Sequence, residues 1–329
     1  MIVDGDSSRQ GTRFVGYDII GDIHGHARTL EALLGTLGYA LVDGAYCHPA
    51  RKAIFLGDFI DRGPYQRGVI RIVRPMIDAG HALAVMGNHE FNAIAYATPR
   101  AGGGFFREHN AHNYQQHKVF LDAYEYTADY HELIDWFGRL PLWLDLGDLR
   151  IVHACWDRVA INRIAEQYDR YGSLSNSLLY ASCTPGNWEF RSVETLLKGK
   201  EIPLPRAQSF TDKDGITRHH IRVRWWDRGA TNYRDAFLGT ESMTTAIPDD
   251  DIEGDHLVEY SHDDVPVFMG HYWLTGKPAP LAPNIACLDY SVAKPGGKLV
   301  AYRWDGERAL APEKFVAETA VEYALTETL

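Results

Sequence analysis

The chain has 329 residues, of which 45% are hydrophobic and 23% charged. This is the composition of a folded globular protein and not of a disordered one. Its 33 basic and 44 acidic residues give a net charge of −11. The excess of acid argues against a nucleic-acid polymer or a membrane surface as partner, since both attract basic faces. Four cysteines without a C-x-x-C pair, and no long apolar run, predict a cytoplasmic protein.

The first half of the chain repeats a strand, a polar loop and a helix three times. Residues 1–13 have neither an apolar segment nor a basic start, and we interpret them as a loose leader. The three predicted strands are Val15–Ile20, Ala53–Leu56 and Ala82–Met86, and each precedes a polar loop and a helical apolar pattern. This repetition predicts an α/β fold that carries its chemistry at the strand ends.

The second half is less regular. Helical spacing predicts a helix over Gln115–Phe137, and short strands are expected at Pro141–Asp145 and Arg150–His153. The stretch from about 160 to 264 is rich in Ser, Asp, Arg and aromatic residues, and we expect it to be an inserted cap. Three more strands are expected at Pro266–Met269, Ile285–Asp289 and Lys298–Trp304. We therefore predict a single domain over 14–329 with a cap at about 160–264.

Five polar clusters follow predicted strands. Their candidate metal ligands are two carboxylates, one amide and three imidazoles: Asp22, His24, Asp58, Asn88, His153 and His271. A mixed nitrogen and oxygen set suits Mn, Fe, Zn or Ni, whereas oxygen alone would favour Mg or Ca. Six ligands with one shared carboxylate can hold two metals. In Asp22-x-His24, alternation along an extended segment is expected to point both side chains to the same side.

The motifs D-x-H, G-D-x-x-D-R-G, G-N-H-E, H and G-H occur here in that order. In this order they resemble the calcineurin-like metallophosphoesterases, in the branch of the phosphoprotein phosphatases and symmetrical dinucleoside tetraphosphatases. The resemblance is dense over Val15–Phe91 and resumes at Leu133–Ala154 and Val267–Trp304. It implies a four-layer αββα sandwich of two mixed sheets, with an inserted cap.

The resemblance also implies a role for each matching residue. Asp22, His24 and Asp58 would hold a first divalent metal. The second would be held by Asp58, which bridges the two metals, and by Asn88, His153 and His271. Manganese is the expected metal, with Fe, Zn or Ni as alternatives. A cation pair lowers the pKa of a shared water, and the resulting hydroxide attacks phosphorus. His89 would be the general acid, oriented by Asp61, while Arg62 binds phosphate and Arg228 is the candidate for a second phosphate contact.

Two substrate classes fit these motifs. The first is a phosphomonoester, either a small molecule or a phosphorylated protein or peptide carrying phosphotyrosine or phosphoserine/threonine. The second is a dinucleoside tetraphosphate cleaved symmetrically. Glu90 favours the first, since the tetraphosphatases usually carry Asp at this position. A non-catalytic, metal-containing binding module and a nuclease of the same superfamily are less favoured alternatives.

One position departs from the family pattern. Where phosphoprotein phosphatases usually have two glycines after the histidine, this chain has Ala154 and Cys155 after His153. The bulkier residues put a transfer of eukaryotic phosphatase specificity in doubt. We interpret Cys155 as a packed thiol and not as a nucleophile.

Overall fold

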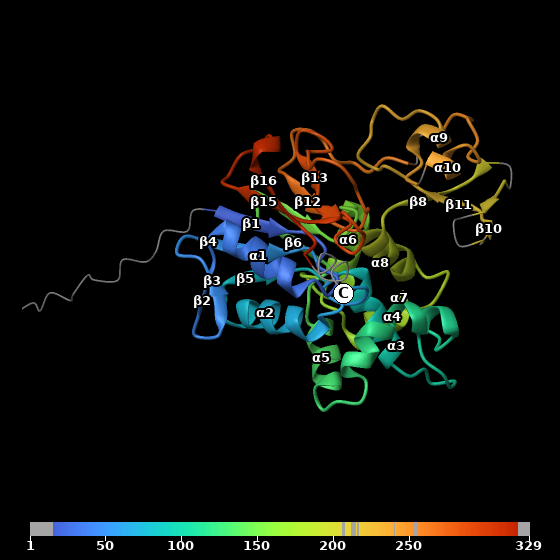
Figure 1. Cartoon of the computed structure of the whole chain (residues 1–329). Helices are drawn as coiled ribbons and strands as arrows, with labels where there is room; N and C mark the ends of the chain where they lie inside the picture. The colour runs from blue at the N-terminus through green and yellow to red at the C-terminus, as the bar shows by residue number, and fades with distance from the viewer. Residues whose placement is uncertain are drawn as a thin grey trace, which may run out of the picture.

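The computed structural model describes residues 16–205, 208–211, 215, 217–239, 241–252 and 256–321. The predicted leader at 1–13 lies outside the described residues. The first sheet is mixed and contains six strands in the order β14-β15-β1-β4-β5, with β16 also paired to β15. Its strands are β1 (Gly16–Ile20), β4 (Arg51–Phe55), β5 (Ala82–Ala84), β14 (Asp289–Tyr290), β15 (Lys298–Trp304) and β16 (Phe315–Thr319). Strands β1, β4 and β5 are parallel, so their carboxyl ends share one edge (Figure 1).

The second sheet is also mixed, and its strand order is β13-β12-β7-β6. Its strands are β6 (Trp143–Asp145), β7 (Arg150–Val152), β12 (Val267–Met269) and β13 (Ile285–Cys287). Neighbouring residues of a strand point to opposite faces, and this separates two layers of core. Ile19, Ile54 and Phe268 belong to one hydrophobic cluster built from both sheets. Their neighbours Ile20 and Phe55 belong to the cluster shared with the helices.

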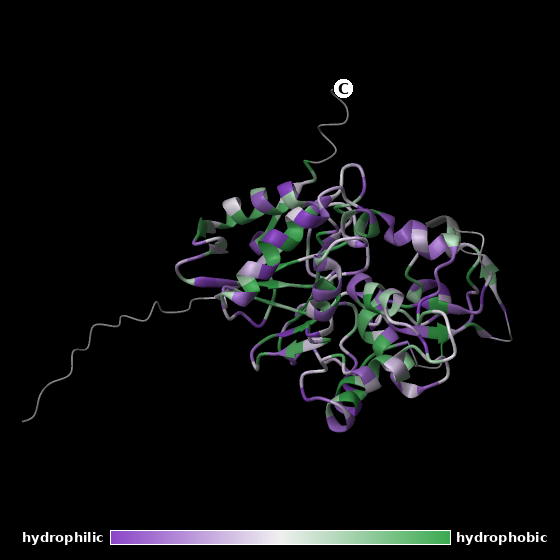
Figure 2. Ribbon diagram, turned by 90° about the horizontal axis from the view of Figure 1, so that it is seen from below, coloured by the Kyte–Doolittle hydropathy of each residue, from purple (hydrophilic) through white to green (hydrophobic). Residues whose placement is uncertain are grey.

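Helices cover the outer faces of the sheets. The principal ones are α1 (Ala27–Leu37), α2 (Gln66–Asp78), α3 (Asn88–Ala97), α4 (Ala111–Tyr124), α5 (Asp129–Gly138), α6 (Arg158–Gln167), α7 (Asn176–Ser182) and α8 (Trp188–Lys198). In α1 the buried Leu30, Leu33, Leu34 and Leu37 recur at helical spacing, and Gly38 ends the helix in the left-handed conformation. The central strands are largely hydrophobic, whereas the helices carry both hydrophobic and hydrophilic residues (Figure 2). The predicted four-layer sandwich of two mixed sheets is confirmed.

Two predicted elements are wrong in their extent. The helix expected over Gln115–Phe137 is two helices, α4 and α5. Both the backbone N–H and the hydroxyl of Thr127 donate to the carbonyl of Tyr124, and this local bonding competes with continued helix. The strand expected over Ile285–Asp289 is divided between the sheets, because β13 pairs with β12 and β14 pairs with β15. Leu288, buried in the cluster between the sheets, marks the crossing.

The stretch expected as a cap contains two differently built parts. Helices α6, α7 and α8 contribute Ile164, Leu178 and Leu196 to the main helical cluster. Residues 201–252 instead surround a small cluster of their own, which includes Ile221 and Phe237. This part, which we call the outer lobe, contains β8 (Glu201–Pro203), β9 (Phe210–Thr211), β10 (Thr217–Arg218), β11 (His220–Arg222), α9 (Tyr233–Ala236) and α10 (Glu241–Thr244). It is gold in Figure 1. The division into one domain with a cap stays a prediction.

Three peripheral elements were not predicted from sequence: the hairpin of β2 (Ala40–Val42) and β3 (Ala45–Cys47), the 3-10 turn η2 (Pro312–Lys314), and β16. None of the described helices is long and apolar enough to cross a bilayer.

Candidate metal centre

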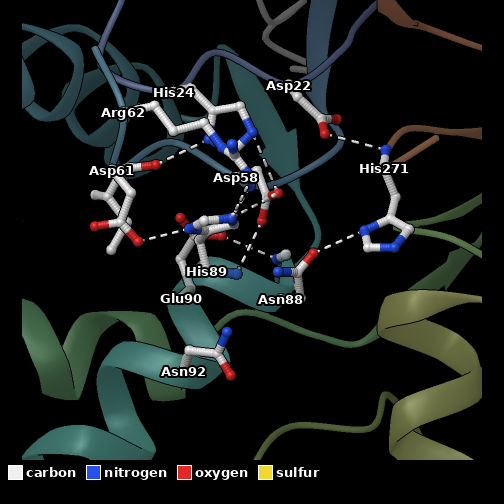
Figure 3. Close-up of polar contacts among 12 residues, drawn as sticks. Asp22, His24, Asp58, Asp61, Arg62, Asn88, His89, Glu90, Asn92 and His271 are labelled. Atoms are coloured by element: carbon white, nitrogen blue, oxygen red, sulfur yellow. Dashed lines mark hydrogen bonds and ion pairs between the residues drawn. The ribbon is translucent and has the colours of Figure 1, made fainter. Parts of the chain in front are cut away.

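The carboxyl ends of parallel strands in both sheets meet at one edge of the sandwich. Strand β4 leads to Asp58, β7 leads to His153 and β12 leads to His271. The ring of His153 donates from Nδ1 to the carbonyl of Leu56 at 2.6 Å, a bond that joins the two sheets at this edge. The amide of Gly270 donates to the carbonyl of His153 at 2.8 Å. The fold thus brings loops from distant parts of the sequence into one buried cluster (Figure 3).

Asp58 lies at the centre of this cluster. Its Oδ2 is 3.6 Å from His24 Nε2, 3.9 Å from His89 Nε2 and 3.4 Å from His153 Nε2. Two groups of potential ligands meet at Asp58, one with His24 and His89 and the other with His153 and His271. Asn88 Oδ1 lies 3.2 Å from His153 Nε2 and 2.8 Å from His271 Nδ1. Asp58 is therefore placed where a bridging ligand would be required.

Backbone carbonyls decide which ring nitrogens can bind a metal. His24 Nδ1 lies 3.0 Å from the carbonyl of Ile60, as His153 Nδ1 lies against that of Leu56. A carbonyl only accepts hydrogen bonds, so in both rings Nδ1 carries a proton, and Nε2, which faces the cluster, is the nitrogen left to bind a metal. Such outer partners commonly orient histidine ligands in metal sites.

Asp22 joins the cluster by a route other than the predicted one. His24 has a φ of +45°, so Asp22-x-His24 is not an extended segment, and the expectation from alternation is wrong. Asp22 Oδ2 instead accepts the backbone N–H of His271 at 3.0 Å. Its Oδ1 is buried with no hydrogen-bond partner among the described residues, and so is His24 Nε2. Unpaired buried polar atoms are costly, and binding to a metal ion would satisfy each of them.

The charges in the cluster also fit cation binding. Burial, followed by the nearby charge of Asp289, raises the pKa of Asp22 well above its usual range. Burial lowers the pKa of His24 and of His271 well below the usual range, which keeps these rings neutral as metal ligation requires. Burial alone would raise the pKa of Asp58, but the charges of His153, His89 and His24 outweigh it and hold that pKa well below its usual range.

These observations together fit a two-metal site, which stays a prediction. The donors of His24, His153 and His271 lie around Asp58, and Asn88 Oδ1 lies beside the last two of these rings. Burial alone would lower the pKa of His153, but the charge and hydrogen bond of Asp58 outweigh burial and raise that pKa above its usual value. A metal ion bound to this ring would displace the proton that Asp58 favours. The set suits a borderline transition metal and does not identify which one.

His89, Asp61 and Arg62 lie beside the ligands. His89 Nδ1 donates to Asp61 Oδ2 at 2.5 Å, and Arg62 Nη2 lies 3.5 Å from His89 Nε2. The amide of His89 donates to Asp58 Oδ1 at 2.9 Å, which ties the start of α3 to the central carboxylate. Nε2 of His89 therefore faces the cluster while Nδ1 is held by a buried carboxylate.

Arg62 is held over the cluster by an indole ring. Its guanidinium carbon lies 3.9 Å from the centroid of the Trp273 ring, and Lys294 Nζ lies 4.2 Å from the same centroid. The backbone N–H of Trp273 donates to Asp289 Oδ2 at 2.7 Å. Trp273 and Asp289 were not among the predicted site residues, since neither lies in a motif whose chemistry is evident from sequence.

The backbone is strained around this site. Eight non-glycine residues among those described have positive φ, and seven of them lie at or next to the cluster: His24, Asp58, Asp61, Arg62, His271, Trp273 and Ser291. Buried side chains hold two of these loops. Glu90 accepts hydrogen bonds from the amides of Asp58, Phe59 and Gly87, and Gln66 accepts from the amide of Asp61. Strain of this kind persists only where surrounding structure imposes it.

An arginine other than the predicted Arg228 lies beside the cluster. Arg228, the predicted residue, donates to the carbonyl of Tyr260 at 2.8 Å and is not brought to the cluster. Arg222 of β11 lies 3.2 Å from His271 Nε2. Sequence alone could not choose between them, because both lie in the same run of arginines and tryptophans. Arg222 is distinguished by its contact with His271, a predicted ligand.

Cys155 is enclosed. The side chain is fully buried in the helical cluster, and burial raises the pKa of its thiol well above the usual value. All four cysteines lie in the described part of the chain and carry free thiols. The geometry agrees with a packed Cys155, because a nucleophilic thiol needs a lowered pKa and access.

A family model for the calcineurin-like phosphoesterases matches residues 17–301. The chain belongs to this family. It is 32% identical over 213 residues to the asymmetrical bis(5′-nucleosyl)-tetraphosphatase PrpE of Bacillus velezensis, an alignment that covers 64% of this chain and 79% of that protein. It is 31% identical over 138 residues to PrpE of Oceanobacillus iheyensis, covering 42% of this chain and only 54% of that relative. The matched family is one of phosphoesterases, and the chain spans only about half the length of the Oceanobacillus relative that it matches.

The fold of this chain resembles those of the solved structures only loosely. A cold-active protein-tyrosine phosphatase of Shewanella aligns with a TM-score of 0.47 at 16% identity, covering 93% of this chain and 80% of the other. A serine/threonine phosphatase of Saccharomyces cerevisiae aligns with a TM-score of 0.48 at 14% identity, covering 94% and 81%. Likeness at this level does not bear on the choice of substrate.

Proposed function

We propose that the chain is a dinuclear metal-dependent phosphatase that hydrolyses phosphomonoesters, including a phosphorylated protein or peptide, in the cytoplasm. The observation that carries this proposal is the buried Asp61–His89 pair beside the candidate ligands. An alkoxide or phenoxide leaving group must be protonated as it departs, and a positioned imidazole supplies that proton. A polyphosphate leaving group has little need of one, because it leaves already as a stable anion.

The metals would be held by the predicted ligands, with Asp58 shared between them and His89 outside the set. A bound metal pair would supply Lewis acidity and an activated water. Arg62, held by Trp273, would bind the non-bridging oxygens of the phosphoryl group through its fork of N–H donors. His89 would present Nε2 to the leaving oxygen while Asp61 fixes the proton on Nδ1.

Arg222 would add a second phosphate contact from the outer lobe. Its guanidinium can only donate, so in the present arrangement His271 Nε2 accepts and the proton of this ring lies on Nδ1. Ligation through Nδ1 requires that proton to move to Nε2. Arg222 would then lose its acceptor and become available to an anion.

A second candidate substrate is a dinucleoside polyphosphate. Both relatives described above are named as asymmetrical tetraphosphatases. Lys294, which packs on the same indole as Arg62, lines a cavity of about 260 Å³ together with Lys298. Two lysines beyond Arg62 would suit a longer anion. The names indicate asymmetrical cleavage, whereas the sequence motifs suggested symmetrical cleavage, and product analysis distinguishes ATP plus AMP from two ADP.

The test is kcat/KM of the manganese-loaded protein on a phosphotyrosine peptide and on diadenosine tetraphosphate, measured side by side. The proposal predicts that the peptide is the better substrate by at least tenfold, and that His89→Ala lowers its turnover by roughly 10²–10⁴-fold. A better dinucleotide would overturn the substrate assignment and leave the metal site intact. If the metal-loaded wild type hydrolyses neither compound, the result supports the non-catalytic alternative.

A further inference from the structure

The buried network around the general acid extends to a histidine outside every motif. His117 lies in α4, only 3% exposed, and its Nδ1 is 2.8 Å from Asp61 Oδ1. We propose that His117 is a positioning residue, which fixes the Asp61 carboxylate and through it the ring of His89. This inference rests on the proposed function, because it concerns the protonation of an ester leaving group.

The geometry places one histidine on each oxygen of Asp61. His89 Nδ1 donates to Oδ2 at 2.5 Å and His117 Nδ1 donates to Oδ1 at 2.8 Å. Rotation of the carboxylate about its Cβ–Cγ bond would break both hydrogen bonds together. With His117 removed, Oδ1 would be buried without its donor, and the carboxylate could turn away from His89. The His89 ring would then lose the contact that sets its tautomer and its angle to the substrate.

The surroundings of His117 select the tautomer that this role needs. Its Nε2 is buried and has no hydrogen-bond partner among the described residues. A proton on Nε2 would be buried unpaired, which favours the proton on Nδ1, where Asp61 accepts it. The ring stacks on Phe120, with centroids 4.7 Å apart, and lies 5.5 Å from the ring of Tyr96. Aromatic neighbours exclude water and strengthen the hydrogen bond to Asp61.

The electrostatics agree with this geometry. Burial alone would raise the pKa of Asp61, but the charge of His117 and its hydrogen bond, followed by those of His89, hold that pKa well below its usual range. His117 therefore helps to keep Asp61 an acceptor for both histidines. Its position on α4, apart from the strand ends, explains why the motif pattern did not include it.

Leaving-group dependence distinguishes positioning from a purely structural role. Phenyl phosphate and p-nitrophenyl phosphate are nearly the same shape, but phenoxide needs a proton to depart and p-nitrophenoxide does not. For the manganese-loaded full chain, His117→Leu is expected to lower kcat on phenyl phosphate by roughly 10–100-fold, the usual effect of losing an outer partner. On p-nitrophenyl phosphate we expect a loss of less than about threefold. His117→Asn keeps a donor near Nδ1 and is expected to restore most of the lost rate.

His109→Leu is the matched control. His109 is another ring beside Tyr96, stacked on it with centroids 3.7 Å apart, but its Nε2 bonds the carbonyl of Tyr96 and not Asp61. It is expected to affect both esters equally or not at all. Equal losses on the two esters with His117→Leu, or an Asn variant no better than Leu, would overturn the inference. Failure of the wild type to hydrolyse either ester would instead remove the proposed function.

A spectroscopic measurement covers the case in which the leucine variant does not fold. With ¹⁵N-histidine labelling, wild-type protein should show downfield resonances from the histidines whose Nδ1–H is hydrogen-bonded, among them one from His89 and one from His117. His117→Asn should remove the second and shift the first. A His117 ring protonated only on Nε2, or a His89 resonance that does not move, would contradict the proposal.

Discussion

The strand-end cluster and the outer lobe are built on different principles. The cluster lies on loops fixed by two sheets, and its predicted ligands and His89 are each less than a tenth exposed, apart from the half-buried His271. The outer lobe rests on strands of two or three residues around a small hydrophobic cluster of its own. It reaches the site through Arg222, and Trp225 anchors it in the main core. The proposed catalytic residues therefore lie on loops fixed by the two sheets, whereas Arg222, the proposed second phosphate contact, lies on a lobe with a small core of its own.

The largest effect should come from Asp58. Asp58→Asn removes the carboxylate that both ligand groups share, and we expect a loss in kcat of roughly 10³-fold, equivalent to several kcal/mol of metal-based stabilisation. Bound metal per chain should fall in parallel, as measured by elemental analysis. Asp145→Asn, at the exposed end of β6, is the control. Full activity of the Asp58 variant would show that the cluster is not the catalytic centre.

Disrupting the outer lobe should separate binding from chemistry. Phe237→Ala opens its small cluster, and a buried Phe→Ala change costs about 3–5 kcal/mol. We expect KM to rise several-fold while kcat on p-nitrophenyl phosphate and the metal content change little. The contrasting variant is Ile54→Ala in the core between the sheets, which should lower the melting temperature of the whole chain. Equal losses of metal from both variants would refute the independence of the two regions.

The two arginines provide a finer test of the same comparison. Arg222→Ala should raise KM roughly 10–100-fold, since a charged hydrogen bond contributes roughly 1.5–3 kcal/mol. Arg228→Ala should leave KM unchanged, because its guanidinium contacts the carbonyl of Tyr260. Steady-state kinetics on one phosphomonoester is sufficient. The reverse order of effects would restore Arg228 to the position that the sequence suggested.

The smallest effect is expected at Cys155. Its thiol is buried and its pKa raised, so it should resist alkylation in the folded protein at pH 8, and Cys155→Ala should retain activity within about twofold. Mass spectrometry after iodoacetamide treatment and a parallel assay would measure both. Rapid alkylation with loss of activity would mean that the thiol takes part in the reaction.

Sequence predicted the parts of this site that follow strands. Asp58, Asn88 and His153 follow strands whose apolar pattern can be recognised in the sequence, and parallel pairing brings such positions together. Three other residues could not be found in this way, because tertiary contacts place them. His117 depends on which face of α4 turns towards Asp61, and Trp273 on a loop with left-handed backbone. Arg222 depends on the pairing of β11 with β8. The division of Ile285–Asp289 between two sheets was equally hidden, since the apolar run from Ile285 to Leu288 is continuous in the sequence.

The most direct test of the account is anomalous diffraction from crystals of the manganese-loaded protein. We predict two anomalous peaks on either side of the Asp58 carboxylate, about 3.5–4 Å apart. One should contact His24 and the other His153 and His271. A single peak, or peaks that do not share Asp58, would contradict the two-metal centre on which the proposed function depends.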